Sequence, residues 1–530
     1  MPKCSASPAS RFPRRNWNAP KNRRGRCSLT APNASRRRPS GWRLPKILKI
    51  TPGLNSSCRA WKRSRSRMCW RWRGASCARR TALLAGSSQP ATANLPRKKN
   101  NTMPDHTNSL PGPDTITRVT LENGITVLVY ENFAAQSVVL AGSLTAGSQH
   151  ETAEKSGLAS MTASALMRGT FTRDFDTIHA NLEDIGADLD IGAGVHTAGF
   201  NGKALAEDLP VLVNLLADVL REPAFPADQV ERLRGEIITG LRYRQQDTRF
   251  RANRAFRDAL YPPNHPYHYS VRGTLQTVPE ITVADLADFH RRHYGPAGMI
   301  VVIVGAVRAG EAVDIVRARL GDWRNSGQST PPPLPEVPPL EETRRVNVII
   351  PGKTQSDIVL GVPGPSRLAD DYRPALLANS VLGQFGMMGR IGEEVREKRG
   401  LAYYAYSALE GGHGPGPWSV IAGVNPANVQ LAVDSIVGEI RRITSEPVSD
   451  EDLADNKSYF TGHLPLQLES NEGIAASILN IETYDLGLDY LLTVCDEINA
   501  LTKEDLLAAA RHYLNPDTFV LAVAGPDSEG

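Results

Sequence analysis

Apolar residues alternate with polar ones, or recur every three to four positions, from residue 117 onward. Residues 117–132 read TRVTLENGITVLVYEN, two alternating segments around Asn123-Gly124, a pattern typical of a β-hairpin. Further strands are expected at 138–146, 188–191, 197–205 and 299–304. Helical spacing predicts helices at 156–167, 175–185, 209–220, 227–246 and 283–293. Strands and helices are interspersed without strict alternation, which indicates the α+β class.

The pattern that closes this first half returns at the end of the chain. In both places Thr opens a predicted helix, Pro ends the connection, and an apolar strand, MIVVIV or FVLAVA, stops at Gly. Five matched pairs lie 220 residues apart: Thr282/Thr502, Asp285/Asp505, Leu286/Leu506, Pro296/Pro516 and Gly305/Gly525. Five matches at one offset indicate a duplication, so we predict two homologous α+β domains.

A proline-rich stretch separates the two predicted domains. Residues 325–340 read NSGQSTPPPLPEVPPL. Proline cannot occupy the interior of a regular element, and proline-rich linkers are semi-rigid spacers. We therefore place an N-terminal domain at 113–324 and a C-terminal domain at 341–528.

Composition sets the first 102 residues apart from the rest. They hold 26 of the 61 Lys and Arg residues and none of the 56 Asp and Glu residues, so residues 103–530 carry a net charge of about −21. Five of the six Cys and five of the seven Trp also lie in this head. Three interpretations stay open: a targeting segment, a basic arm that binds nucleic acid, or translated upstream DNA with the true start at Met103. The head lacks helical or strand periodicity, which favours the start at Met103.

These alternatives decide the expected location. A start at Met103 predicts a cytoplasmic protein, and a targeting head predicts an organelle or export. The body has only Cys495, so no disulfide framework is expected. No run approaches the roughly 20 apolar residues of a membrane span, so we expect no membrane association, and we expect no nucleic-acid binding by the acidic body.

One helical segment carries a specific resemblance. Residues 157–170, GLASMTASALMRGT, resemble the signature G-x-A-H-x-x-E-H-x-L-x-x-G-T of the insulinase/pitrilysin superfamily of zinc metallopeptidases, in its mitochondrial-processing-peptidase-like branch. In that family two His at i and i+4 share one helical face and hold zinc, and the Glu takes a proton from metal-bound water. The resemblance implies a duplicated fold in which each domain is a mostly antiparallel sheet packed with helices.

The metal-binding residue types are missing from this segment. Ser160, Ala163 and Ser164 stand at the first His, the Glu and the second His. A serine hydroxyl is a poor zinc ligand, and alanine cannot act as a base. The family's third ligand, a Glu some 75 residues further on, falls in the window 238–241, Ile-Thr-Gly-Leu, with Glu236 about one turn away. We therefore expect no metal in this chain and zinc in a partner subunit.

Two other histidine pairs have a spacing that could supply a replacement metal site. His265/His268 in HPYH and His290/His293 in HRRH both have His-x-x-His spacing. Neither pair has an intervening Glu or an evident third ligand, and a zinc site needs at least three protein ligands. Structural or solvent-facing roles are expected for both.

The second half retains a different signature. Residues 392–407, GEEVREKRGLAYYAYS, resemble the family's R-E-K-R-G-L-A-Y segment. In the family this Arg and the Tyr seven residues on lie across the cavity from zinc and hold the substrate backbone. The resemblance assigns these substrate-binding roles to Arg396 and Tyr403. An Arg near a helix end also compensates the helix dipole, and a Tyr in a strand also packs across strands, so a purely structural role stays open.

Together these features predict a subunit that is inactive alone. The leading hypothesis is a heterodimer in which a homologous zinc-bearing chain supplies the metal. In it, this chain binds unfolded or extended peptides and completes the active chamber. Two alternatives remain: a structural assembly subunit without catalytic role, and a stand-alone zinc peptidase with an atypical metal site.

Overall fold

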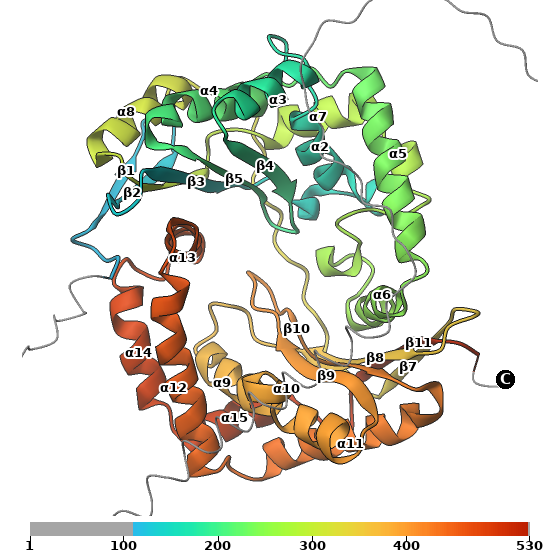
Figure 1. Cartoon of the computed structure of the whole chain (residues 1–530). Coiled ribbons are helices and arrows are strands. Elements are labelled where there is room, and N and C mark those ends of the chain that lie inside the picture. Colours follow the sequence, from blue (N-terminus) through green and yellow to red (C-terminus); the bar gives the residue numbers. More distant parts are fainter. Residues whose placement is uncertain (1–109, 528–530) are drawn as a thin grey trace, which may run out of the picture. The chain divides into compact units, whose positions relative to one another are not determined.

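The computed structural model describes residues 110–527, and the predicted basic head at 1–102 lies outside them. The first of two sheets has six strands in the order β1-β2-β6-β3-β5-β4 (Figure 1). Neighbouring strands are antiparallel except for the parallel pair β2 and β6. The strands are β1 Ile116–Thr120, β2 Thr126–Glu131, β3 Ser137–Leu144, β4 Asp188–Ala193, β5 Ala198–Leu205 and β6 Ile300–Gly305.

The second sheet repeats this arrangement. Its order is β7-β11-β8-β10-β9, and only β7 and β11 are parallel. Strand for strand this order matches β2-β6-β3-β5-β4 of the first sheet, which confirms the duplicated α+β fold. The strands are β7 Arg344–Ile349, β8 Ser356–Pro363, β9 Ala402–Leu409, β10 Pro417–Val424 and β11 Val520–Gly525.

The matched segments that close each half have the same local structure. Helix α7, Val283–His293, and helix α15, Lys503–Tyr513, begin with a capping box made by Thr282 with Asp285 and by Thr502 with Asp505. In both boxes the Asp backbone N–H donates to the Thr hydroxyl over 3.1 Å. The sequence signal for the duplication thus rests on helix caps that satisfy otherwise free backbone donors.

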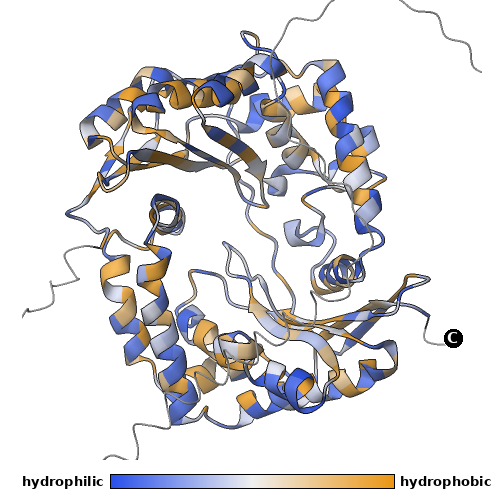
Figure 2. Cartoon of the chain, viewed as in Figure 1, coloured by the Kyte–Doolittle hydropathy of each residue, from blue (hydrophilic) through white to orange (hydrophobic). Residues whose placement is uncertain are grey.

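Helices pack on the faces of the two sheets, and Figure 2 shows apolar residues concentrated in the strands. In the first half they are α2 Leu158–Leu166, α3 Phe175–Asp184, α4 Leu209–Arg221, α5 Ala227–Arg244, α6 Thr248–Leu260, α7 and α8 Ala309–Leu320. In the second half they are α9 Tyr372–Gly383, α10 Phe385–Ile391, α11 Val429–Ser445, α12 Asp450–Gln467, α13 Asn471–Thr483, α14 Tyr490–Ala500 and α15. The pattern-based helices of the first half are confirmed, whereas α6 and α8 were not expected.

Each half contributes one helix to the sheet of the other half (Figure 1). Helix α13 packs on β3 and β6, where Ile474, Ala475 and Ile478 share a core with Leu128, Val139 and Val302. Helix α6 packs on the second sheet, where Ala252, Phe256 and Leu260 share a core with Val359, Ile421 and Val520. Two such cores tie the halves together, so the predicted spacer at 325–340 is not their only connection.

The segment between the halves contains no helix or strand from Arg324 to Thr343. Across residues 110–527, no helix combines the length and the apolar character needed to cross a membrane.

Candidate functional site

The motif helix α2 begins at a tightly packed turn. Its N-cap, Gly157, has a φ of +100°, and a Cβ there would meet the Cα of Gly273 at 2.7 Å. The Glu151 carboxylate accepts backbone hydrogen bonds from Gly157 over 3.0 Å and from Ala159 over 2.5 Å, which satisfies free donors of the first turn. Burial raises the pKa of Glu151 to about 8. Local packing and this cap fix the direction in which α2 presents its side chains.

Helices α2 and α5 face each other across a cavity of about 250 Å³. Ser160 and Ser164 line it from α2, and Glu236 and Gly240 line it from α5. The structure therefore brings the two predicted His positions next to the predicted third-ligand window, of which Gly240 and Leu241 line the cavity. Ala163, at the predicted base position, is fully buried and does not line the cavity.

The residues of this α2–α5 cavity do not fit the zinc ion that the resemblance implies. Ser160 and Ser164 offer neutral hydroxyls, and Gly240 has no side chain, whereas zinc in proteins binds imidazole, thiolate and carboxylate. Glu236, the one acid in the lining, has its carboxylate 2.6 Å from the Arg168 guanidinium. Within residues 110–527, no group of three or more His, Cys, Asp and Glu side chains is placed to hold a metal.

Both histidine pairs make intramolecular hydrogen bonds. The buried His265 caps a short turn, where its Nδ1 accepts from the Tyr267 backbone N–H. His290 Nε2 lies 2.8 Å from the Leu220 carbonyl oxygen. His293 Nδ1 lies 2.6 Å from the Ser329 hydroxyl. These contacts agree with the structural roles expected for the pairs.

Arg396 lies in the second half, in a π-helical segment, Gly392–Lys398. Gly400, with a φ of +62°, follows the segment and donates its N–H to the Arg396 carbonyl, as a glycine that ends a helix does. The Arg396 side chain is 30% exposed and lies 3.7 Å from Glu397. It is not among the residues that line the α2–α5 cavity.

Tyr403 is presented to solvent by an irregularity in β9. Gly423 of β10 pairs with Tyr404 and Val424 pairs with Ala402, so Tyr403 is the extra residue of a β-bulge. A bulge redirects a side chain, and Tyr403 is 83% exposed. Strand β9 is also an edge strand of its sheet. Tyr403 therefore has no directly opposite residue in β10.

The hairpin loop at 411–417, between β9 and β10, packs against the first half. The Gly414 backbone N–H donates to the Tyr267 hydroxyl over 3.2 Å. The His413 ring lies 5.0 Å from the ring of His196, and the His196 Nε2 lies 2.8 Å from the same Tyr267 hydroxyl. Burial, with the nearby His413 and His265 rings, lowers the pKa of His196 to about 4.

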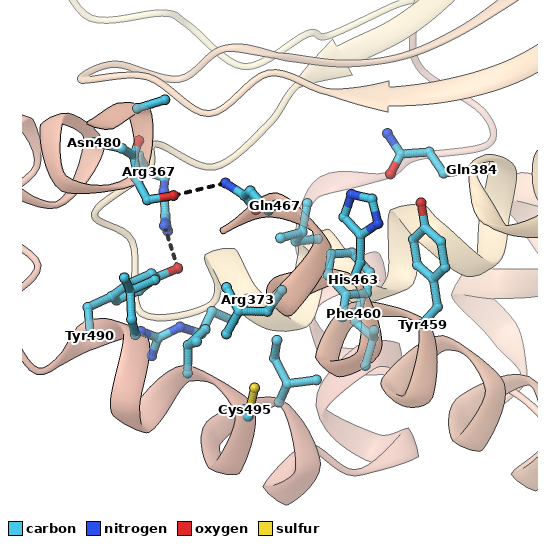
Figure 3. A pocket seen from close by; sticks show the side chains of 18 residues that line it. Arg367, Arg373, Gln384, Tyr459, Phe460, His463, Gln467, Asn480, Tyr490 and Cys495 are labelled. Carbon is cyan, nitrogen blue, oxygen red and sulfur yellow. Dashed lines mark hydrogen bonds between the residues drawn. The ribbon is translucent and has the colours of Figure 1, made fainter. Parts of the chain in front are cut away.

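The second half contains a cavity of about 530 Å³ for which no sequence motif provides a signal (Figure 3). It lies among α9, α12, α13 and α14. Its walls are mainly apolar, and Arg367 and Arg373 also line it. None of the predicted site residues belongs to this wall.

Comparison with known proteins defines the class. Residues 126–260 match the family model described as Insulinase (Peptidase family M16), and residues 280–460 match that of the Peptidase M16 inactive domain. The first match lies within the first half, from β2 to α6, and the second runs from α7 of the first half into α12 of the second. The chain belongs to the insulinase family of peptidases, M16.

Individual relatives extend the likeness over most of the chain. An uncharacterized zinc protease of Mycobacterium leprae is 28% identical over 421 residues, which is 78% of this chain and 92% of the relative. The mitochondrial-processing peptidase subunit beta of Saccharomyces cerevisiae is 23% identical, over 77% of this chain and 90% of that subunit.

Solved structures show the same fold. A peptidase M16 inactive domain from Pseudomonas fluorescens has a TM-score of 0.72 and 25% identity, and the match covers 78% of this chain and 98% of that one. A protease from Helicobacter pylori has a TM-score of 0.73 at 19% identity, and the match covers 79% of this chain and all of that chain.

Proposed function

We propose that this chain is the non-zinc-binding subunit of a processing-peptidase-like metalloendopeptidase. It binds extended peptide and completes the active chamber of a homologous partner that carries the zinc. The observation that carries the proposal is the composition of the α2–α5 cavity, where Ser160, Ser164 and Gly240 meet. Hydroxyls and a glycine cannot supply the ligand set that activates water on zinc.

Arg396 and Tyr403 are the residues proposed to bind substrate. The Arg396 guanidinium offers several donors, and its side chain approaches only Glu397, at 3.7 Å, among the ion pairs of residues 110–527. The bulge leaves the Tyr403 phenol free to donate. Such donors can hold a peptide carbonyl and stabilise negative charge that develops on it. The edge of β9 also offers backbone groups to which an extended peptide can add as a strand.

The need for a partner follows from the same residues. This chain has donors that can bind a peptide, but the α2–α5 cavity lacks the ligand set that would hold zinc to activate water. Among the similar proteins, the yeast relative is by its name one subunit of a processing peptidase. We propose a heterodimer with a homologue that has an intact His-x-x-Glu-His helix.

The proposal is tested with the chain from Met103, alone and mixed with an intact-motif homologue from the same genome. Zinc per chain and hydrolysis of quenched fluorescent peptides are measured. We expect far less than one zinc and no chelator-sensitive hydrolysis for the chain alone, and activity above that of the homologue alone for the mixture. Arg396→Ala should lower kcat/KM of the mixture about 10- to 100-fold. Arg399→Ala, which removes a nearby arginine paired with Glu394, is the matched control.

Two outcomes would replace the proposal. One zinc per chain with chelator-sensitive hydrolysis by the chain alone would establish a stand-alone peptidase with an atypical site. A stable complex whose activity does not respond to Arg396→Ala would indicate a structural assembly subunit.

A further inference from the structure

The cavity of the second half has the size and lining of a small-molecule site. Its volume of about 530 Å³ lies within the range of roughly 300–1,000 Å³ that ligand pockets occupy. Apolar side chains from three helices form its walls: Leu376, Leu377, Phe460, Leu464, Leu491 and Val494.

Helix α12 explains why this space is open. The helix has 18 residues, yet Asn456 is its only buried residue. The side chains of Phe460 and Leu464 of this helix form part of the cavity wall and are only partly buried. A core helix of this length normally buries a full apolar stripe. Helix α12 thus borders the cavity with partly buried side chains and contributes no buried apolar stripe to a core.

The charge of the lining is one-sided. It includes Arg367, Arg373 and His463 and no Asp or Glu. Arg373 is already paired with Glu497. Arg367 makes no ion pair within residues 110–527, and its guanidinium donates to the Tyr490 hydroxyl over 2.9 Å, as Figure 3 shows. A guanidinium has five donors, so Arg367 retains donors for an incoming anion.

We propose that this cavity binds a small amphipathic carboxylate, with the carboxylate on Arg367 and the apolar body between α9, α12 and α14. Two sources share this chemistry: a medium-chain fatty acid, and the C-terminal residue of a peptide that ends in an apolar side chain. The carboxylate and guanidinium form a charge-assisted hydrogen bond, and the walls remove the apolar body from water. The inference concerns this chain alone and holds with or without a zinc-bearing partner.

Cys495 supplies a direct readout, because it lines the cavity and is the single cysteine of the described chain. Burial raises the pKa of its thiol, so alkylation is measured at alkaline pH by mass spectrometry of the Cys495 peptide. The probes are decanoate, decanol, and N-acetyl-Leu-Phe as free acid and as amide. Decanoate or the free-acid peptide should slow alkylation at least about fivefold, whereas decanol and the amide should bind about tenfold more weakly or worse.

Variants locate the site. Arg367→Gln should weaken binding of the carboxylate about tenfold or more, and Arg317→Gln, an exposed arginine on α8, is the control that should change nothing. Ala476→Trp adds bulk at an exposed position of the cavity wall and should block protection even if Arg367→Gln fails to fold. Protection by decanoate identifies a fatty acid, and protection by the peptide acid identifies a peptide terminus. The inference is overturned if neither carboxylate protects Cys495, or if folded Arg367→Gln and Ala476→Trp proteins bind as the parent does.

Discussion

The exchange of helices between the halves predicts that a cavity made in the second half weakens the first sheet. Ile478 of α13 is fully buried against the first sheet, in one core with Leu128, Val139 and Val302. Ile478→Ala removes three carbons, which costs about 2.4 kcal/mol in transfer free energy at about 0.8 kcal/mol each. The remaining cavity adds up to about 2 kcal/mol, at about 24 cal/mol per Å³ over roughly 80 Å³. We expect the free energy of unfolding to fall by about 2–4 kcal/mol.

Hydrogen exchange of individual backbone amides is the assay, because it reports which strands lose protection. Where an amide exchanges only from an opened state, a loss of about 3 kcal/mol in the free energy of that opening accelerates its exchange roughly 100-fold. We expect this acceleration for the amides of β3 and β6. The control is Ile349→Ala, which makes the same deletion on a side chain that is 58% exposed and should cost less than about 1 kcal/mol.

One result would refute this reasoning. If Ile478→Ala accelerated exchange only in α12 and α14 and left β3 and β6 as protected as before, α13 would not be part of the first sheet's core. The halves would then be separate units joined by the spacer, as the sequence alone suggested.

Three further outcomes are expected. Phe256→Ala in α6 should destabilise by about 3–5 kcal/mol and expose amides of β8 and β11, measured by the same exchange experiment. The pKa of Glu151 is about 8 in the folded protein, above its ordinary value of 4.5, so the contribution of this group to the free energy of unfolding is fully present below pH 4.5. We expect the free energy of unfolding to fall by up to about 5 kcal/mol as pH rises through 8. Denaturant titrations at several pH values measure this fall, and Glu151→Gln should lack it. The combined change Ser160→His, Ser164→His and Gly240→Glu should bind about one zinc per chain by elemental analysis, and the same changes with Gly240 retained should bind it at least tenfold more weakly.

Local features of the fold could be predicted from the sequence because short-range physics determines them. The hairpin around Asn123-Gly124 and the two capping boxes involve residues within a few positions of each other. Because the same local signals recur at an offset of 220 residues, they predict a duplication, and the matched strand orders of the two sheets confirm it. The exchange of α6 and α13 could not be predicted, because an apolar helical stripe has the same pattern whichever sheet covers it.

The candidate site divides in the same way. The motif in α2 could be placed by its resemblance. The third-ligand window of four residues is narrowed only by the cavity that α5 shares with α2, which Gly240 and Leu241 line. The exposure of Tyr403 depends on a β-bulge, which shifts the register between β9 and β10. The alternation of polar and apolar residues along β9 alone does not predict such a shift. The cavity beneath α12 depends on how far four helices stand apart, which no single segment specifies.

The three motif positions in α2 differ physically, and this difference explains how the fold tolerates their residues. Seven of the nine residues of α2 are buried, Ala163 among them, whereas Ser160 and Ser164 face the cavity. Because positions 160 and 164 lie outside the core, serine in place of histidine there removes no buried side chain from it. The packing of its buried residues and the Glu151 cap therefore hold α2 in place. At position 163 alanine suits the core, and a glutamate there would have to be paired or would cost several kcal/mol. The stability of α2 is thus independent of any metal, and the fold can present Arg396 and Tyr403 without one.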